Sequence, residues 1–286
     1  MRKQISVATQ GKRVGISPLN IQRIFPNKYV DAVGPFVFLD YVAPIIKKTI
    51  DINGMGAHPH RGIATLTYIV QGEVEHFDSA GNTGKIYSGG VQWMKAGNGI
   101  IHDEIINYDS QTDSKYIYGF QFWINLPAKN KAEKPQYIAI QTNDVPRKFL
   151  FDNVGWIKVV VGSYEELNSI IPNYSEQFLY HIHLYAKQSF SIKFEDKTQV
   201  AAFLPTQDVV LNNTEFNNGD FVEFDNNAGE IEFKNNSEKS IDIILFGGEK
   251  YTETIVAVGP FVMNSVEEIE IANRDFHAGK YGKIEI

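Results

Sequence analysis

Short apolar segments separated by turn residues recur along almost the whole chain, and their spacing limits the fold more than any other feature. Runs rich in Val, Ile, Phe and Tyr alternate with Gly, Asn, Asp and Pro at intervals of roughly 8 to 12 residues. Such intervals are typical of antiparallel sandwiches and barrels, in which strands are short and turns are tight. The clearest predicted strands are residues 63–70, 119–126, 156–162, 178–185, 221–224 and 241–246.

Helical periodicity is scarce in comparison. It is found near residues 163–171, where Ser163 could cap a first turn, and near residues 265–276. Both segments are short beside the strand-like remainder of the chain, and we expect them to be minor elements. The sequence therefore predicts an all-β fold with few short helices.

The length of the chain predicts two domains. A chain of 286 residues exceeds the usual single domain, and 43% hydrophobic with 13% aromatic residues supplies enough apolar material for two cores. Residues 126–145 are polar and contain Pro127 and Pro135, which is typical of a linker. We expect a first barrel over residues 1–130 and a second barrel over residues 131–286.

One phrase of sequence occurs twice. The letters AVGPFV stand at residues 32–37 and again at residues 257–262, near opposite ends of the chain. Two related halves would explain the repeat, and chance recurrence of a common strand-entry phrase is the alternative. If the halves are related, each could lend its segment to the other barrel, so that the end of the chain joins the first barrel.

Composition limits the kinds of site and partner to be expected. The chain has no cysteine, so any metal must be held by His, Asp or Glu. With 27 Lys and Arg against 34 Asp and Glu it carries a net charge of −7 and has no basic run, which disfavours direct nucleic-acid binding. It shows neither a signal peptide nor the roughly 18 apolar residues of a membrane helix, so we expect a soluble, cytoplasmic protein without membrane contact.

Three of the seven histidines fall in two glycine-flanked segments. His58 and His60 lie in the sequence HPHRG, and His102 lies in GNGIIHDE, which ends at Glu104. Residues two apart on an extended backbone point to the same face, so each pair projects one way. The glycines before His102 suit a tight turn that could return the chain to the same barrel mouth. Together, three imidazoles and one carboxylate suit a divalent first-row metal and leave two octahedral positions open.

Other polar residues have simpler interpretations. A lone His-Pro-His could also be a turn with exposed imidazoles. His181 and His183 are interpreted as ordinary strand histidines, so we expect the second barrel to hold no metal. His76 lies in a polar hairpin and is expected to touch solvent rather than metal. Arg61 could reach an anionic substrate, although an ion pair at the barrel mouth is the commoner role.

The two histidine segments resemble the metal motifs of the cupin superfamily and, within it, of the pirin family. Pirins contain His-Pro-His-Arg-Gly and hold their metal with both of these histidines, a later histidine and the glutamate two residues after it. The matching positions here are His58, His60, His102 and Glu104. Further similarities include TGK at 83–85, QWM at 92–94 and GPFVMN at 259–264. Two positions depart from the pattern: Ala64 stands where many pirins have a glutamate, and Asp103 replaces a small residue between the last two ligands.

The resemblance implies two cupin barrels, of the double-stranded β-helix or jelly-roll kind, packed together. It implies one divalent metal ion. Fe(II) is the expected ion, and Mn, Ni, Co, Cu or Zn are the alternatives. Some pirins open flavonols such as quercetin with O2, so the implied function is a dioxygenase acting on a flavonol or another enol or phenol, with Glu104 as the catalytic base. A rival hypothesis is a metal-dependent protein-binding module, similar to a transcriptional co-regulator, without turnover.

Overall fold

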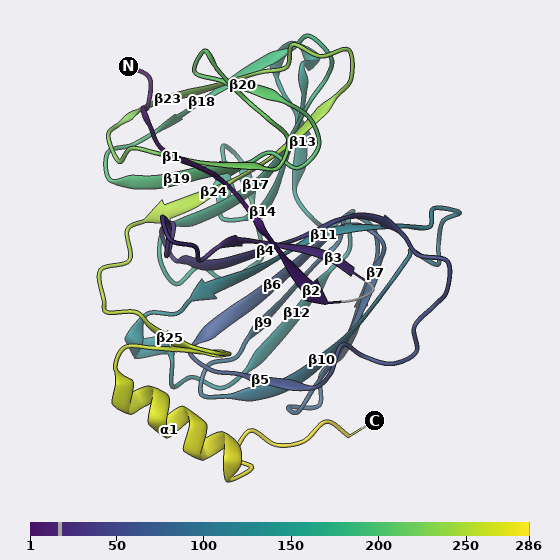
Figure 1. Cartoon of the computed structure of the whole chain (residues 1–286), viewed down its shortest axis with the longest axis vertical. Coiled ribbons are helices and arrows are strands. Elements are labelled where there is room, and N and C mark those ends of the chain that lie inside the picture. The colour runs from purple at the N-terminus through teal and green to yellow at the C-terminus, as the bar shows by residue number, and fades with distance from the viewer. Residues whose placement is uncertain (17–18, 286) are drawn as a thin grey trace. The chain divides into compact units, whose positions relative to one another are not determined.

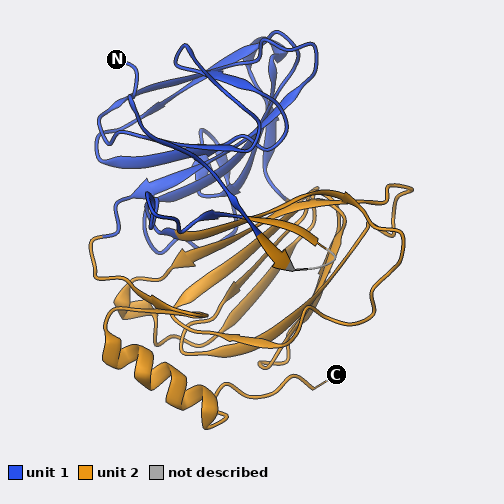
Figure 2. Cartoon of the chain, viewed as in Figure 1, with its two compact units in different colours: residues 1–13, 23–36, 145–251 blue, residues 14–22, 37–144, 252–286 orange. Residues whose placement is uncertain are grey.

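The structure is a computed structural model of the chain, and it describes residues 1–16 and 19–285 (Figure 1). These residues form two compact units, and each unit combines segments that are far apart in the sequence (Figure 2). Unit 1 contains residues 1–13, 23–36 and 145–251, and unit 2 contains residues 14–22, 37–144 and 252–286. The first residues of the chain thus belong with its second half, and the last residues belong with its first half.

Unit 2 contains the predicted histidine segments and is built mainly from two antiparallel sheets. A seven-stranded sheet has the order β12 (Gln136–Ile140), β9 (Val91–Lys95), β6 (Ile63–Gln71), β11 (Tyr116–Asn125), β4 (Phe36–Ile46), β3 (Leu19–Phe25) and β2 (Lys12–Ile16). A four-stranded sheet has the order β5 (His58–His60), β10 (Ile100–Asn107), β7 (Glu73–Asp78) and β8 (Thr83–Ile86).

The two sheets of unit 2 enclose an interior that holds both an apolar cluster and buried polar side chains. On β10, Ile100, His102 and Glu104 are buried, whereas the alternate Ile101 and Asp103 are half-buried. This period of two is that of a strand with one face turned inward. From the opposite sheet, the ring of Trp123 lies 5.0 Å from the ring of His60. The barrel interior is therefore lined from both sides, and the predicted ligands lie on its four-stranded wall.

Unit 1 has the same arrangement of a seven-stranded and a four-stranded sheet. Its seven-stranded sheet has the order β1 (Ile5–Gln10), β22 (Asp220–Phe224), β19 (Thr198–Phe203), β24 (Ile241–Glu249), β17 (Gln177–Leu184), β14 (Gly155–Val161) and β13 (Arg147–Phe149). Its four-stranded sheet has the order β18 (Ser189–Phe194), β23 (Gly229–Lys234), β20 (Val209–Leu211) and β21 (Thr214–Phe216). Buried Val, Ile, Leu and Phe side chains from both sheets form one core. The predicted all-β fold with two barrels is confirmed.

The predicted helices had different outcomes. The helix near residue 265 is present as α1 (Val266–His277), and the side chain of Ser265 caps it by accepting from Glu268 N at 3.2 Å. The prediction of a helix near residue 163 was wrong. That segment forms the hairpin β15 (Ser163–Tyr164) and β16 (Leu167–Asn168), with Glu165 at φ 50° in its two-residue turn. Tyr164 and Leu167 pack against the apolar core of unit 1, which outweighs the local helical preference.

The expected linker is largely structured. It holds the short 3-10 helix η1 (Ala128–Asn130) and strand β12, which extends the sheet of unit 2 by pairing with β9 along its whole length. The unit boundary lies between Asp144 and Val145 rather than near residue 130. A second 3-10 helix, η2 (Phe151–Asn153), follows β13 in unit 1.

The two copies of AVGPFV form the same turn. Gly34 and Gly259 have φ angles of 56° and 57°, each followed by a proline. Val33 pairs with Phe36 in unit 1, and Val258 pairs with Phe261 in the hairpin β25 (Val256–Val258) and β26 (Phe261–Met263) of unit 2. A two-residue hairpin turn of this kind needs a positive φ at its first central residue, which glycine adopts without strain.

In the part of the chain that the structure describes, no helix has the length and apolar character needed to cross a bilayer.

Candidate metal centre

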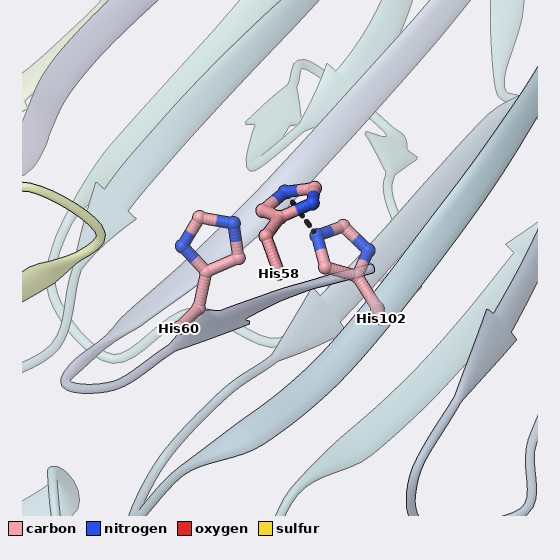
Figure 3. A group of neighbouring side chains, drawn as sticks. All are labelled: His58, His60 and His102. Carbon is pink, nitrogen blue, oxygen red and sulfur yellow. Dashed lines mark hydrogen bonds between the residues drawn. The ribbon is translucent and has the colours of Figure 1, made fainter. Parts of the chain in front are cut away.

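The pairing of β5 with β10 brings three histidines to one place. His102 lies opposite His58, and Ile100 lies opposite His60. Cross-strand partners share a face of the sheet, so all three imidazoles project into the barrel of unit 2. Figure 3 shows the rings turned toward one another, two from β5 and one from β10. Their ring centroids are 4.4 to 5.1 Å apart, and one nitrogen from each ring forms a group within 4.8 Å.

Backbone carbonyls fix two of the three rings. His58 Nδ1 lies 2.8 Å from Gly56 O, and His60 Nδ1 lies 3.2 Å from Pro260 O. A carbonyl oxygen only accepts, so each Nδ1 carries the proton and each Nε2 presents its lone pair. His102 Nε2 lies 3.1 Å from His58 Nε2, and its buried Nδ1 has no partner among the described residues.

Burial keeps the imidazoles of His60 and His102 neutral. It lowers the pKa of His60 to about 3, with a further contribution from the neighbouring His58. Burial also lowers the pKa of His102 well below its usual value, helped by His60 and His58. A neutral imidazole is the form that binds a metal ion, so no proton must be displaced from these two rings at neutral pH.

Glu104 is buried one step further along β10. Its Oε1 accepts a hydrogen bond from Gln92 Nε2 and a longer one, 3.3 Å, from Thr67 Oγ1. Tyr137 OH donates to Gln92 Oε1 at 3.1 Å, which turns the amide of Gln92 so that its NH2 group faces Glu104. Burial raises the pKa of Glu104. Its carboxylate forms a second candidate group with His102 and His76 rather than with His58 and His60.

The expectation that His76 touches solvent was wrong. The side chain is buried in the barrel, because His76 lies opposite Glu104 in the pairing of β7 with β10. Its Nε2 lies 3.1 Å from Asp78 Oδ2, and its ring stacks on Tyr137 with centroids 4.2 Å apart. The strand sequence EVEHFD has polar residues on both faces, so only the pairing shows which face is inside.

His181 and His183 have protein partners in unit 1. Both lie near Asp242 Oδ1, with His181 Nε2 at 3.0 Å and His183 Nδ1 at 2.6 Å. Burial alone would raise the pKa of Asp242, yet hydrogen bonds from both histidines lower it. The ring of Trp156 stacks on His183 with centroids 5.0 Å apart. This arrangement fits the interpretation of ordinary strand histidines.

Two cations hold the turn that follows the histidine pair. Arg61 donates to Asp275 Oδ2 at 2.8 Å and to Tyr281 OH at 3.3 Å, so it forms an ion pair, the commoner of its two expected roles. Lys131 Nζ donates to Gly62 O at 3.0 Å and to Asn125 Oδ1 and Val262 O at 2.6 Å. The C-terminal segment of the chain is thereby tied to the strand that carries His58 and His60.

Lys131→Met is expected to lower the free energy of unfolding by about 3 kcal/mol. The reason is that Asn125 Oδ1 and Val262 O lose the Lys131 donor, and each unsatisfied group costs about 1–3 kcal/mol, whereas Gly62 O still accepts from Leu126 N. Chemical denaturation of the metal-free protein measures the loss. Lys129→Met, at an exposed position of η1, is the matched control and should change stability little. Equal stability of the two variants would contradict a structural role for Lys131.

Comparison with known families agrees with this geometry. The family model for pirin matches residues 19–124, and the model for the pirin C-terminal cupin domain matches residues 179–282. The chain belongs to the pirin family. Pirin-1 of Arabidopsis thaliana is 33% identical over 235 residues, 80% of this chain and 78% of that protein. A Pseudomonas aeruginosa protein named as a candidate quercetin 2,3-dioxygenase is 31% identical over 250 residues, 87% of each chain.

Solved structures show the same fold over the whole length of this pirin. A crystal structure of quercetin 2,3-dioxygenase from Acinetobacter baumannii aligns with all of both chains, at a TM-score of 0.90 and 29% identity. The two units are therefore the two domains of a cupin β fold. A cluster of His and Glu side chains that could hold a divalent metal lies in unit 2.

Proposed function

We propose that this pirin is a metal-dependent dioxygenase that opens flavonols such as quercetin with O2. His58, His60, His102 and Glu104 would hold the ion, and Fe(II) is the ion that we propose. Support comes from the side chains gathered in the unit 2 barrel and from the full-length similarity to a quercetin 2,3-dioxygenase. The nitrogen spacing at the barrel wall is the observation that carries the proposal.

The residues present fit a divalent ion. Two nitrogens bound about 2.1 Å from one ion, at an angle near 90°, are about 3 Å apart. The separation of His58 Nε2 and His102 Nε2 is 3.1 Å. His60 presents its own Nε2 beside them, because Pro260 O engages the other nitrogen. Outer hydrogen bonds from ligand imidazoles to carbonyls are typical of protein metal sites.

The donor types limit the metal but do not select one. Imidazole suits Fe, Ni, Cu and Zn, and a carboxylate widens the range to Mn. Three neutral imidazoles and one carboxylate leave one positive charge on a divalent ion, which favours an anionic flavonol over a neutral one. When bound, the ion supplies Lewis-acid and redox chemistry toward the substrate and O2.

Residues of the chain would handle the substrate proton. Glu104 is held by Gln92 and Thr67 through Oε1, and we propose that its other carboxylate oxygen takes the flavonol hydroxyl proton. Gln92 is oriented in turn by Tyr137, whose ring packs on His76. The ring of Phe38 stacks on Trp123 at 4.1 Å and supports the apolar wall beside His60.

The proposal is tested by oxygen uptake. Protein freed of metal and loaded anaerobically with Fe(II) should consume O2 when quercetin is added, with one O2 for each quercetin bleached. Mn, Ni, Co, Cu and Zn loadings identify the active ion. If no loading consumes O2 with any flavonol, the dioxygenase proposal fails, and a metal-dependent binding module becomes the better hypothesis.

A further inference from the structure

Asp103 departs from the family pattern, and the structure gives it a defined set of contacts. It lies between His102 and Glu104 on β10, with its side chain on the outer face of the sheet. Its Oδ1 accepts from Gly56 N at 3.0 Å and from Glu104 N at 2.8 Å. The carboxylate therefore joins β10 to the loop that precedes His58.

Gly56 links Asp103 to His58 through its two backbone polar groups. Its carbonyl oxygen accepts from His58 Nδ1 at 2.8 Å, while its nitrogen is held by Asp103. Gly56 has φ 108°, a conformation that L side chains rarely adopt. The loop makes one more backbone contact with β10, from Met55 N to Glu104 O at 2.9 Å.

The loop also fits around the Asp103 side chain. A Cβ added at Gly54 would lie 2.1 Å from Asp103 Oδ2, far inside van der Waals contact. At this position the backbone passes directly over the carboxylate, so glycine at 54 and aspartate at 103 are complementary in shape. The packing, like the hydrogen bond, depends on this chain's own residue at 103.

We propose that Asp103 is a positioning residue for His58. His58 is half-buried at the start of a three-residue strand, whereas His60 and His102 are 2% and 1% exposed. Packing thus fixes His58 less than the other two rings, and its orientation depends on Gly56 O. The inference rests on the proposed metal site, and it assigns to Asp103 the restraint that presents His58 Nε2 to the ion.

Cobalt titration tests the inference without any assay of activity. Metal-free protein is titrated with Co²⁺, and the visible absorption bands report both affinity and ligand field. Asp103→Ala should weaken Co²⁺ binding about 10-fold, the lower end of the effect of outer hydrogen-bond partners. Asp103→Asn should bind within about 3-fold of wild type, because an amide oxygen also accepts from Gly56 N. Glu75→Ala, which removes an outward carboxylate from the neighbouring strand, should have no effect.

A double-mutant cycle separates positioning from general damage. In a His58→Ala background, Asp103→Ala should cause no further loss of Co²⁺ affinity, because its effect passes through His58. An undiminished loss there, or a wild-type affinity for Asp103→Ala alone, would overturn the inference. If wild type itself fails to bind Co²⁺, Fe²⁺ or Ni²⁺, the proposed metal site is what fails.

The contact between Gly54 and Asp103 can be tested on the metal-free protein. Gly54→Ala should lower the unfolding midpoint when Asp103 is present and should be tolerated in Asp103→Ala, where the space is vacant. Equal effects of Gly54→Ala in both backgrounds would show that the loop does not pack on Asp103 as described.

Discussion

Protein carrying His102→Ala is expected to bind the divalent ion more than about 100-fold more weakly than wild type, since even loss of an outer hydrogen-bond partner costs about 10- to 100-fold. His102 is the member common to both candidate groups, and its ring centroid lies 4.4 Å from that of His58 and 5.4 Å from that of His76. Its removal takes away the only ligand that the group of His60 shares with the group of Glu104 among the described residues. Elemental analysis after dialysis against a weak chelator measures the loss.

His181→Ala is the matched control for this experiment. It also removes a buried strand histidine, but one whose partner is Asp242 in unit 1. Metal content should remain that of wild type. A loss equal to that of His102→Ala would mean that the ion is not held where we place it. His60→Ala should resemble His102→Ala, because its Nε2 faces the same space.

Glu104→Gln should keep part of the metal, on His58, His60 and His102, and lower turnover of quercetin per bound ion about 10²- to 10⁴-fold, the usual contribution of a general base. Glutamine matches the shape of glutamate, but its single amide oxygen can accept from Gln92 and Thr67 only if its NH2 group faces the ion. It cannot take a proton from the substrate. Steady-state oxygen uptake, normalised to bound iron, separates the loss of the base from loss of the ion.

Glu75→Gln provides the control, because Glu75 lies on the outward face of β7. It should retain full activity. Full activity of Glu104→Gln with normal metal content would remove the proton role from Glu104. A matching fall in iron and in turnover would show instead that Glu104 acts only as a ligand.

Much of the fold is local in origin and could be predicted. The segment Ile63–Gln71 is long and apolar, and it forms a central strand buried on both faces. Ser265 caps the one predicted helix that forms. The helix predicted at 163–171 does not form, because its helical pattern is weak and the burial of Tyr164 and Leu167 decides the conformation of the segment.

The spacing of the candidate residues alone predicts which of them share a face of a strand. His58 and His60, like His102 and Glu104, are two residues apart, and a strand places such residues on one face whatever the rest of the chain does. The two segments are also marked by glycines, which the turns require. These features, and the resemblance to pirins, can be recognised from the sequence alone.

Only the tertiary structure decided which side chains meet those residues. His76 faces the site because β7 pairs with β10 in a register that sets it opposite Glu104, and its own strand has polar residues on both faces. The carbonyl of Pro260 reaches His60 because the last segment of the chain belongs to unit 2. The period of two along each strand fixes which neighbours share a face. The partners across sheets and between distant segments depend on long-range register and burial, which no local pattern encodes.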